Sequence, residues 1–351
     1  MAERRVNPDK LRIFVAEVFK AAGVGAEESL RIAGNLVEAN LYGHDSHGCG
    51  LLPTYIQDLA AGEAVAGQSA KVIADCGSMI GFDGQKGFGQ SIGIEAMDEG
   101  IARAEKYGVA IVGVGNTHHL ARIGHWGEQC ARAGLASVHF VNVIHAPTVA
   151  PWGGRDARLV TNPVCVAVPF ESEPLVLDFA TSATAYGKVR VAYEAGKEMP
   201  PGKLIDSEGK PTNDPSVLMD SPFGAILPFG EYKGAGLAFM CEVLGGALMG
   251  GLVQDKAPEG KPLLNNMMSI IFKPYQMRTK EEFEAQVKGV MDWVRSSPST
   301  GDGETVFFPG EVERRTLKER SEHGIPLAEG TLNGFFECAR FLGIENPESM
   351  I

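Results

Sequence analysis

The fold class is indicated by one short run, Val109-Ala110-Ile111-Val112-Gly113-Val114. Its consecutive small, β-branched and aliphatic residues are typical of a strand buried within a sheet. A second run of this kind spans residues 136–141, and residues 123–133 between the two have a helical pattern. Strands that alternate with helices in this way predict an α/β protein.

Similar patterns extend from this centre towards both ends of the chain. We expect further strands at residues 71–73, 164–168, 175–177 and 269–272, and a further helix at residues 91–107. Both ends have apolar residues at helical spacing, in residues 8–22, 26–42, 311–322 and 328–342. We therefore predict a mixed-sheet core over residues 69–310 and a helical domain built from residues 1–68 and 311–351.

The composition argues against several classes of function. The 351 residues carry a formal charge of −12 and no basic cluster, so a nucleic acid is not an expected partner. The most apolar stretch, residues 236–253, contains Glu242 and several glycines, so no membrane-spanning helix is expected. The six cysteines form no Cys-x-x-Cys pair, and the start of the chain has no signal-peptide pattern. We expect a cytoplasmic protein with no membrane partner.

The histidines are the strongest indication of chemistry. Two pairs, His44/His47 and His118/His119, stand in loops flanked by glycine. A histidine, with an ordinary pKa of about 6.5, can give a proton to a carbonyl oxygen and take it back. The same side chains with Asp45 could instead bind zinc or iron, although the helical His-Glu-x-x-His pattern is missing. A single histidine is more often structural, so the pairing carries the prediction.

The fingerprints of nucleotide-binding loops are incomplete. Gly113-x-Gly115 is followed by His118 where the third glycine of Gly-x-Gly-x-x-Gly would stand, and no Walker A sequence occurs. The residues by themselves therefore predict an α/β enzyme with a histidine-lined cleft.

Seven short motifs occur in order along the chain. They are His44-Asp45-Ser46-His47-Gly48, Asn116-Thr117-His118-His119, Ala150-Pro151-Trp152-Gly153-Gly154, Thr161-Asn162-Pro163, Leu177-Asp178-Phe179-Ala180-Thr181-Ser182, Lys233-Gly234 and Phe308-Pro309-Gly310-Glu311. Each is weak alone, but the ordered set covers nearly the whole chain. In this set the chain resembles the type 2 malate/L-lactate dehydrogenase family.

The resemblance implies a homodimer in which a non-Rossmann α/β core binds NAD or NADP, and this accounts for the missing glycine fingerprint. It implies a reversible hydride transfer that converts a 2-oxo acid into a 2-hydroxy acid. His47 matches the proton donor and acceptor of the family, with Ser46 beside it in a polar relay. In some relatives His119 has that role. Thr161 and His44 are expected at the substrate.

The same resemblance places a set of residues along the cofactor. These are His119, Leu120, Ala121, Arg122, Ile123, Asn142, Asp178, Phe179, Ala180, Lys233, Gly234, Phe308, Pro309, Gly310 and Glu311. By residue type alone, Asp178 could equally end a strand, and Lys233-Gly234 could be a solvated turn. No bound metal is expected.

Two positions depart from the pattern of the family. Leu51 stands where many relatives carry the arginine that pairs with the substrate carboxylate, and Lys188 stands where some carry an acid in the relay. Arg122 and Lys188 are therefore the candidate cations for the carboxylate, and Lys188 joins the catalytic group. We expect Leu51 to face the rest of the substrate as an apolar wall, which favours apolar 2-oxo acids.

Two other functions stay open at this point. A metal-dependent hydrolase would use His44, His47 and either His118 or His119 as ligands. A non-catalytic dimeric binding protein would need none of this chemistry. The metal content of the purified protein distinguishes the metal-dependent hydrolase from a dehydrogenase. Binding of NADH distinguishes a dehydrogenase from the binding protein.

Overall fold

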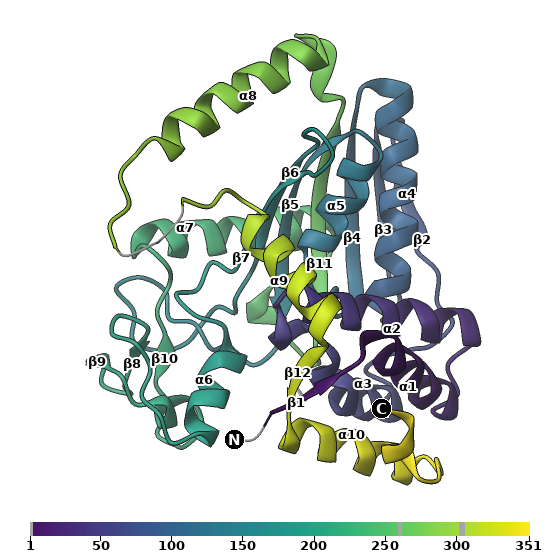
Figure 1. The fold of residues 1–351 in the computed structure, drawn as a ribbon, viewed down its shortest axis with the longest axis vertical. Coiled ribbons are helices and arrows are strands. Elements are labelled where there is room, and N and C mark those ends of the chain that lie inside the picture. The colour runs from purple at the N-terminus through teal and green to yellow at the C-terminus, as the bar shows by residue number, and fades with distance from the viewer. Residues whose placement is uncertain (1–2, 259–261, 302–305) are drawn as a thin grey trace.

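The computed structural model describes residues 3–258, 262–301 and 306–351, and its centre is a seven-stranded sheet (Figure 1). The strand order is β2-β3-β4-β11-β5-β6-β7. β3 and β4 are parallel, and every other neighbouring pair is antiparallel. The strands are β2 (Lys71–Asp75), β3 (Met79–Asp83), β4 (Val109–His118), β5 (Ala136–Ile144), β6 (Val164–Val168), β7 (Leu175–Phe179) and β11 (Leu264–Phe272).

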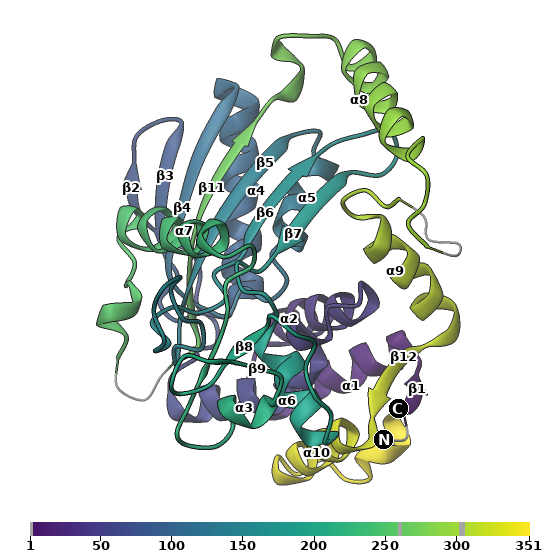
Figure 2. The same ribbon diagram turned by 90° about the vertical axis from the view of Figure 1, so that its left-hand side faces the viewer.

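Helices cover both faces of this sheet. α4 (Gly89–Tyr107) and α5 (Gly124–Arg132) lie on one face, and α7 (Tyr232–Cys241) lies on the other (Figure 2). α4 approaches α5 closely at Gly93, where an added Cβ would lie 2.5 Å from the Trp126 ring. The chain therefore needs a residue without a side chain at this crossing.

The two ends of the chain fold together into a helical unit below the sheet (Figures 1 and 2). Strand β1 (Glu3–Val6) pairs antiparallel with β12 (Ile325–Ala328), which joins the first and last segments. The helices are α1 (Pro8–Ala21), α2 (Ala26–Leu41), α3 (Leu52–Ala61), α9 (Glu311–His323) and α10 (Glu329–Phe341). Their shared core includes Phe14, which contacts Phe335 and Phe336 at ring distances of 6.2 and 6.1 Å.

A third group of elements lies beside the sheet. A three-stranded sheet, in the order β10-β8-β9, packs with α6 around a small apolar cluster. Its elements are α6 (Tyr186–Glu194), β8 (Leu204–Ile205), β9 (Pro211–Thr212) and β10 (Ala225–Ile226). A further helix, α8 (Lys280–Arg295), begins at Thr279, whose side chain accepts from the backbone N–H of Glu282 in a capping box.

The prediction of an α/β fold with a mixed sheet is confirmed. Each predicted strand and helix is present. The largest difference between predicted and observed bounds is at β11, which begins at Leu264 and not at residue 269. The division into two domains stays a prediction. No helix in the described ranges is long and apolar enough to cross a membrane.

Candidate active site

The loop at residues 44–48 is held in place by hydrogen bonds with an arginine and an asparagine of the helical unit. Arg320, on α9, donates to both carboxylate oxygens of Asp45, at 2.6 and 3.0 Å. Asn40, at the end of α2, donates to Asp45 at 2.6 Å and accepts from the backbone N–H of Cys49 at 2.7 Å. Arg320 also donates to the Asn40 carbonyl. The loop is therefore tied at both ends to the helical unit.

This loop brings His47 against His119, which directly follows β4. The two rings are nearly parallel, with centroids 5.6 Å apart and 21° between their planes. The hydroxyl oxygen of Ser46 lies 3.1 Å from Nδ1 of His47. The structure thus joins the two predicted histidine motifs, which are 72 positions apart in the sequence (119 − 47).

Both rings are held in their neutral form. Burial, followed by the nearby His44, lowers the pKa of His47 to about 4. Burial, followed by the nearby His47, holds the pKa of His119 well below its ordinary value. Desolvation disfavours a charged ring, and two adjacent histidines resist a second charge. Near pH 7 the pair therefore offers one neutral imidazole beside another.

Each histidine of the second motif has a partner from α3. His119 Nδ1 lies 2.8 Å from the Tyr55 hydroxyl, which also accepts from Nε2 of Gln90 at 3.1 Å. His118 Nε2 lies 3.0 Å from Asp58. His118 is fully buried, whereas His119 is partly exposed. His119 is therefore the member of this motif that a substrate can reach.

Arg122 is buried and already paired. It is 2% exposed, and it donates to both carboxylate oxygens of Glu128, at 3.1 and 2.7 Å. Glu38 lies 3.7 Å away, and the guanidinium stands 4.2 Å over the ring of Tyr42. Its charge is thus balanced inside the protein, which leaves Lys188 as the candidate cation that is exposed.

Several segments expected at the cofactor contact β7 or the residues that follow it. Asp178 accepts from the backbone N–H of Gly124 at 2.7 Å, which links this strand to the segment after β4. The carbonyl of Pro309 accepts from the backbone of β7 at 3.4 Å. Lys233 and Gly234 are not a solvated turn but lie in the first turn of α7, and an added Cβ at Gly234 would lie 2.8 Å from the Thr181 carbonyl, just after β7. Three segments that are distant in sequence are brought together here.

The residues expected at the substrate have different surroundings. The carbonyl of Thr161 accepts from the backbone N–H of Thr181 at 2.9 Å. His44 Nε2 lies 3.6 Å from Glu313 on α9. Leu51 is partly exposed and packs against the core of the helical unit.

Lys188 is brought near the loop of the first histidine pair by its helix. It is exposed on α6, directly after Gly187. An added Cβ at Gly187 would lie 3.1 Å from Cβ of Ser46, so the start of α6 touches this loop.

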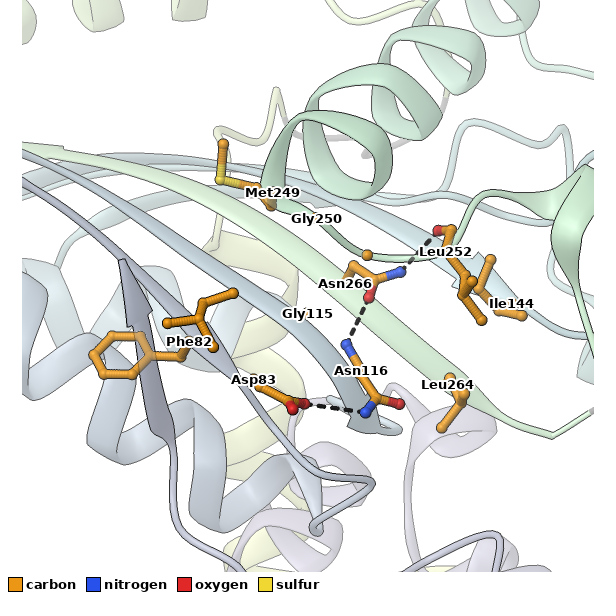
Figure 3. A pocket seen from close by; sticks show the side chains of 12 residues that line it. Phe82, Asp83, Gly115, Asn116, Ile144, Met249, Gly250, Leu252, Leu264 and Asn266 are labelled. Atoms are coloured by element: carbon orange, nitrogen blue, oxygen red, sulfur yellow. Dashed lines mark hydrogen bonds between the residues drawn. The ribbon is translucent and has the colours of Figure 1, made fainter. Parts of the chain in front are cut away.

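A pocket of about 400 Å³ opens at the end of β4 and the start of β11 (Figure 3). On its wall, Asn266 accepts from the backbone N–H of Asn116 at 2.7 Å and donates to the Leu252 carbonyl at 3.1 Å. Asn116 in turn donates to Asp83 at 3.0 Å. These groups satisfy one another, so they hold the end of β4, from which the second histidine motif emerges.

Asn142 belongs to the same amide network. It is fully buried, donates to Glu242 and the Leu252 carbonyl, and accepts from Asn266 at 2.7 Å. The side chain of Asn142 is therefore engaged by partners inside the protein.

Some residues of this site carry no local sequence signal. Tyr55 and Gln90 follow no motif: Tyr55 contacts His119, and Gln90 contacts Tyr55, only because α3 and α4 pack against the end of β4. Arg320 could have been found only through its charge on a helix of the predicted C-terminal unit. Among the described residues, no group of three or more His, Cys, Asp or Glu side chains could hold a metal ion.

Comparison with known proteins adds to this geometry. The sequence pattern of the malate/L-lactate dehydrogenase family matches residues 6–335. The chain is 43% identical to hydroxycarboxylate dehydrogenase B of Escherichia coli O157:H7 over 351 residues, which is 99% of this chain and 96% of that protein. It is 37% identical to an L-lactate dehydrogenase of Cupriavidus necator, over 91% of this chain and 92% of that protein.

A solved structure has the same fold. Sulfolactate dehydrogenase from Methanocaldococcus jannaschii superposes with a TM-score of 0.87 at 30% identity, covering 99% of each chain. The similarity therefore includes the helical unit, the sheet and the elements beside it.

Proposed function

The chain belongs to the malate/L-lactate dehydrogenase family, and from this membership we propose that it reversibly reduces 2-oxo acids to 2-hydroxy acids, with His47 moving the proton. One observation carries the proposal. The rings of His47 and His119 are stacked, and the carboxylate of Asp178 on β7 is close enough to act on the charge of His47. The proposal includes NAD or NADP as cofactor and a homodimer as the working unit.

The residues around β7 and the segment that follows it fit a dinucleotide. The first turn of α7 at residues 233–234 and the segment at residues 308–311 offer backbone groups beside β7 and the residues that follow it. Lys233 is exposed and has no ion pair within the described part of the chain, so its charge is free for a phosphate. When bound, the nicotinamide supplies or accepts the hydride at C2 of the substrate.

The protein residues handle the proton and the charge. In reduction the carbonyl oxygen gains charge and takes a proton from His47, which becomes neutral. In oxidation neutral His47 takes the hydroxyl proton back. Ser46, at 3.1 Å from Nδ1, holds the ring in its orientation through both directions. The protein thus supplies a base and an acid in one side chain.

Lys188 is the cation that we assign to the substrate carboxylate. It is exposed at the start of α6, next to the loop of His47, whereas Arg122 is balanced by Glu128 and Glu38. Leu51 then faces the remainder of the substrate, which favours branched or aromatic 2-oxo acids over dicarboxylates.

The test is oxidation of NADH and NADPH by the purified protein with a panel of 2-oxo acids. We expect turnover with apolar 2-oxo acids, and we expect His47→Ala to lower kcat by about 10²–10⁴ while NADH binding hardly changes. Elemental analysis of the same sample should find no stoichiometric metal. Turnover by His47→Ala close to that of the wild type would show that His47 does not transfer the proton. The homodimer is tested separately, by measuring the mass of the protein in sedimentation experiments.

A further inference from the structure

The hydroxyl of Tyr55 lies between two partners beneath the histidine pair. Tyr55 is fully buried, and its ring contacts His118 and His119 edge-on at 4.7 and 6.0 Å. Its oxygen lies 3.1 Å from Nε2 of Gln90 and 2.8 Å from Nδ1 of His119. Burial raises the pKa of Tyr55, so the hydroxyl keeps its hydrogen.

This arrangement determines where the hydrogen of the His119 ring lies. A tyrosine hydroxyl has one hydrogen to donate. Because the amide of Gln90 donates to the Tyr55 oxygen, the hydroxyl hydrogen is directed to Nδ1 of His119. Nδ1 then accepts, and a neutral ring must carry its own hydrogen on Nε2.

The surroundings of Gln90 support this direction. Gln90 is fully buried, and its Oε1 has no hydrogen-bond partner among the described residues. Turning the amide around would leave the NH₂ group without a partner instead. A buried N–H without a partner is rarer in proteins than an under-satisfied carbonyl oxygen. The orientation in which Gln90 donates is therefore the favoured one.

We propose that Gln90 and Tyr55 are positioning residues that fix His119 as the tautomer with hydrogen on Nε2. In this form His119 donates a hydrogen bond to the substrate carbonyl oxygen but has no second proton to transfer. The proton comes from His47 alone. A neutral imidazole that stabilises developing negative charge in this way acts as one donor of an oxyanion site. Among the described residues, His119 makes its side-chain hydrogen bond through Nδ1, and Nε2 has no partner.

The tautomer can be read directly by ¹⁵N NMR of histidine-labelled protein without substrate. His119→Gln identifies the signal by its loss. We expect Nε2 to be of the protonated, pyrrole type and Nδ1 of the pyridine type across the neutral pH range. Tyr55→Phe should give a mixture of the two forms. If the wild-type signals show the hydrogen of His119 on Nδ1, the proposal is overturned, whichever substrate the protein accepts.

Gln90→Glu provides a nearly isosteric second test. An ionised Glu at position 90 accepts from the Tyr55 hydroxyl, so Tyr55 can accept from His119 and the ring hydrogen moves to Nδ1. A protonated Glu can donate as the amide does, and burial raises its pKa. Relative to the wild type at the same pH, we expect an equal kcat at low pH and a loss of up to about 10²–10³-fold as pH rises. Gln85→Glu is the matched control, because Gln85 is partly exposed and bonds only the Ser69 carbonyl through its amide.

The effect on turnover rests on the proposed function, but the tautomer does not. If the protein reduces no 2-oxo acid while NMR finds hydrogen on Nε2, the proposed function fails and the positioning role holds. If Gln90→Glu folds with wild-type thermal stability and its tautomer stays that of the wild type at high pH, the role of Gln90 is refuted.

Discussion

At the scale of single residues, the surroundings of His47 determine the pH dependence that we expect. Its pKa is lowered to about 4, by burial first and then by His44. Reduction uses the protonated ring, whose share falls about tenfold for each pH unit above the pKa, whereas oxidation uses the neutral ring. Between about pH 6 and 8, kcat/KM for reduction should therefore fall about tenfold per unit, while kcat/KM for oxidation stays level.

Initial rates in both directions, measured in buffers of constant ionic strength, check this expectation. A reduction profile that is level up to about pH 7 would show that the pKa of His47 is close to its ordinary value. The residual activity of His47→Gln should lack this dependence.

Lys188 gives a second prediction at this scale. Replacing it with Met removes a charged hydrogen bond to the carboxylate, worth about 1.5–3 kcal/mol, so KM for the 2-oxo acid should rise about 10–100-fold. NADH binding should not change, and Lys210→Met, on an exposed turn, is the control. Adding Leu51→Arg should restore part of the loss. An unchanged KM in Lys188→Met would place the carboxylate elsewhere.

The sequence could predict the histidines of the site but not their supports. The two pairs are visible because each stands in a glycine-flanked loop. The partnership of His119 with Tyr55 is not visible, because it depends on how α3 packs against the end of β4. Nor could the sequence show that Arg122 is neutralised, since Glu38 approaches it from another helix.

At the scale of elements, α9 holds the loop of His47 in place through Arg320. The bidentate contact to Asp45 and the amide of Asn40 fix the backbone on both sides of His47. Displacing a catalytic group by about 1 Å can cost about 10²-fold in rate. We expect Arg320→Met to lower kcat about 10–100-fold, with little change in the affinity for NADH.

A steady-state comparison with Arg315→Met, on the same helix, tests this role. Arg315 has no ion pair within the described part of the chain. Arg320→Lys should recover part of kcat, because a lysine keeps the charge but not the two-point contact. Equal losses in both Met variants would mean that α9 acts through its general stability.

The elements themselves could be predicted where their pattern is long. The run of consecutive apolar residues at 109–114 and the helical spacing at residues 26–42 are long enough to be recognised, and both elements are present. The strands β8, β9 and β10 have two residues each, which is too short for any period. They form only because α6 packs with them around a small cluster.

At the scale of the whole molecule, the first and last segments complete one hydrophobic core. Val6 and Phe14 pack in it with Phe335 and Ile351, and the loop of His47 is anchored on the same unit. The helical pattern of both ends was visible in the sequence, but the pairing of β1 with β12 was not. A strand of four residues gives little signal without its partner.

Phe335 should therefore control the stability of the unit that carries the loop at residues 44–48. It is fully buried and contacts Phe14, whereas Phe341 on the same helix is 85% exposed. Truncating a buried Phe to Ala removes apolar contacts and leaves a cavity, at a cost of about 3–5 kcal/mol. We expect this loss in the free energy of unfolding for Phe335→Ala, measured by denaturant titration, and less than about 0.5 kcal/mol for Phe341→Ala. Because the unit also anchors the loop at residues 44–48, Phe335→Ala should lose activity at a lower denaturant concentration than the wild type. Equal stability of the two variants would show that α10 is not part of this core.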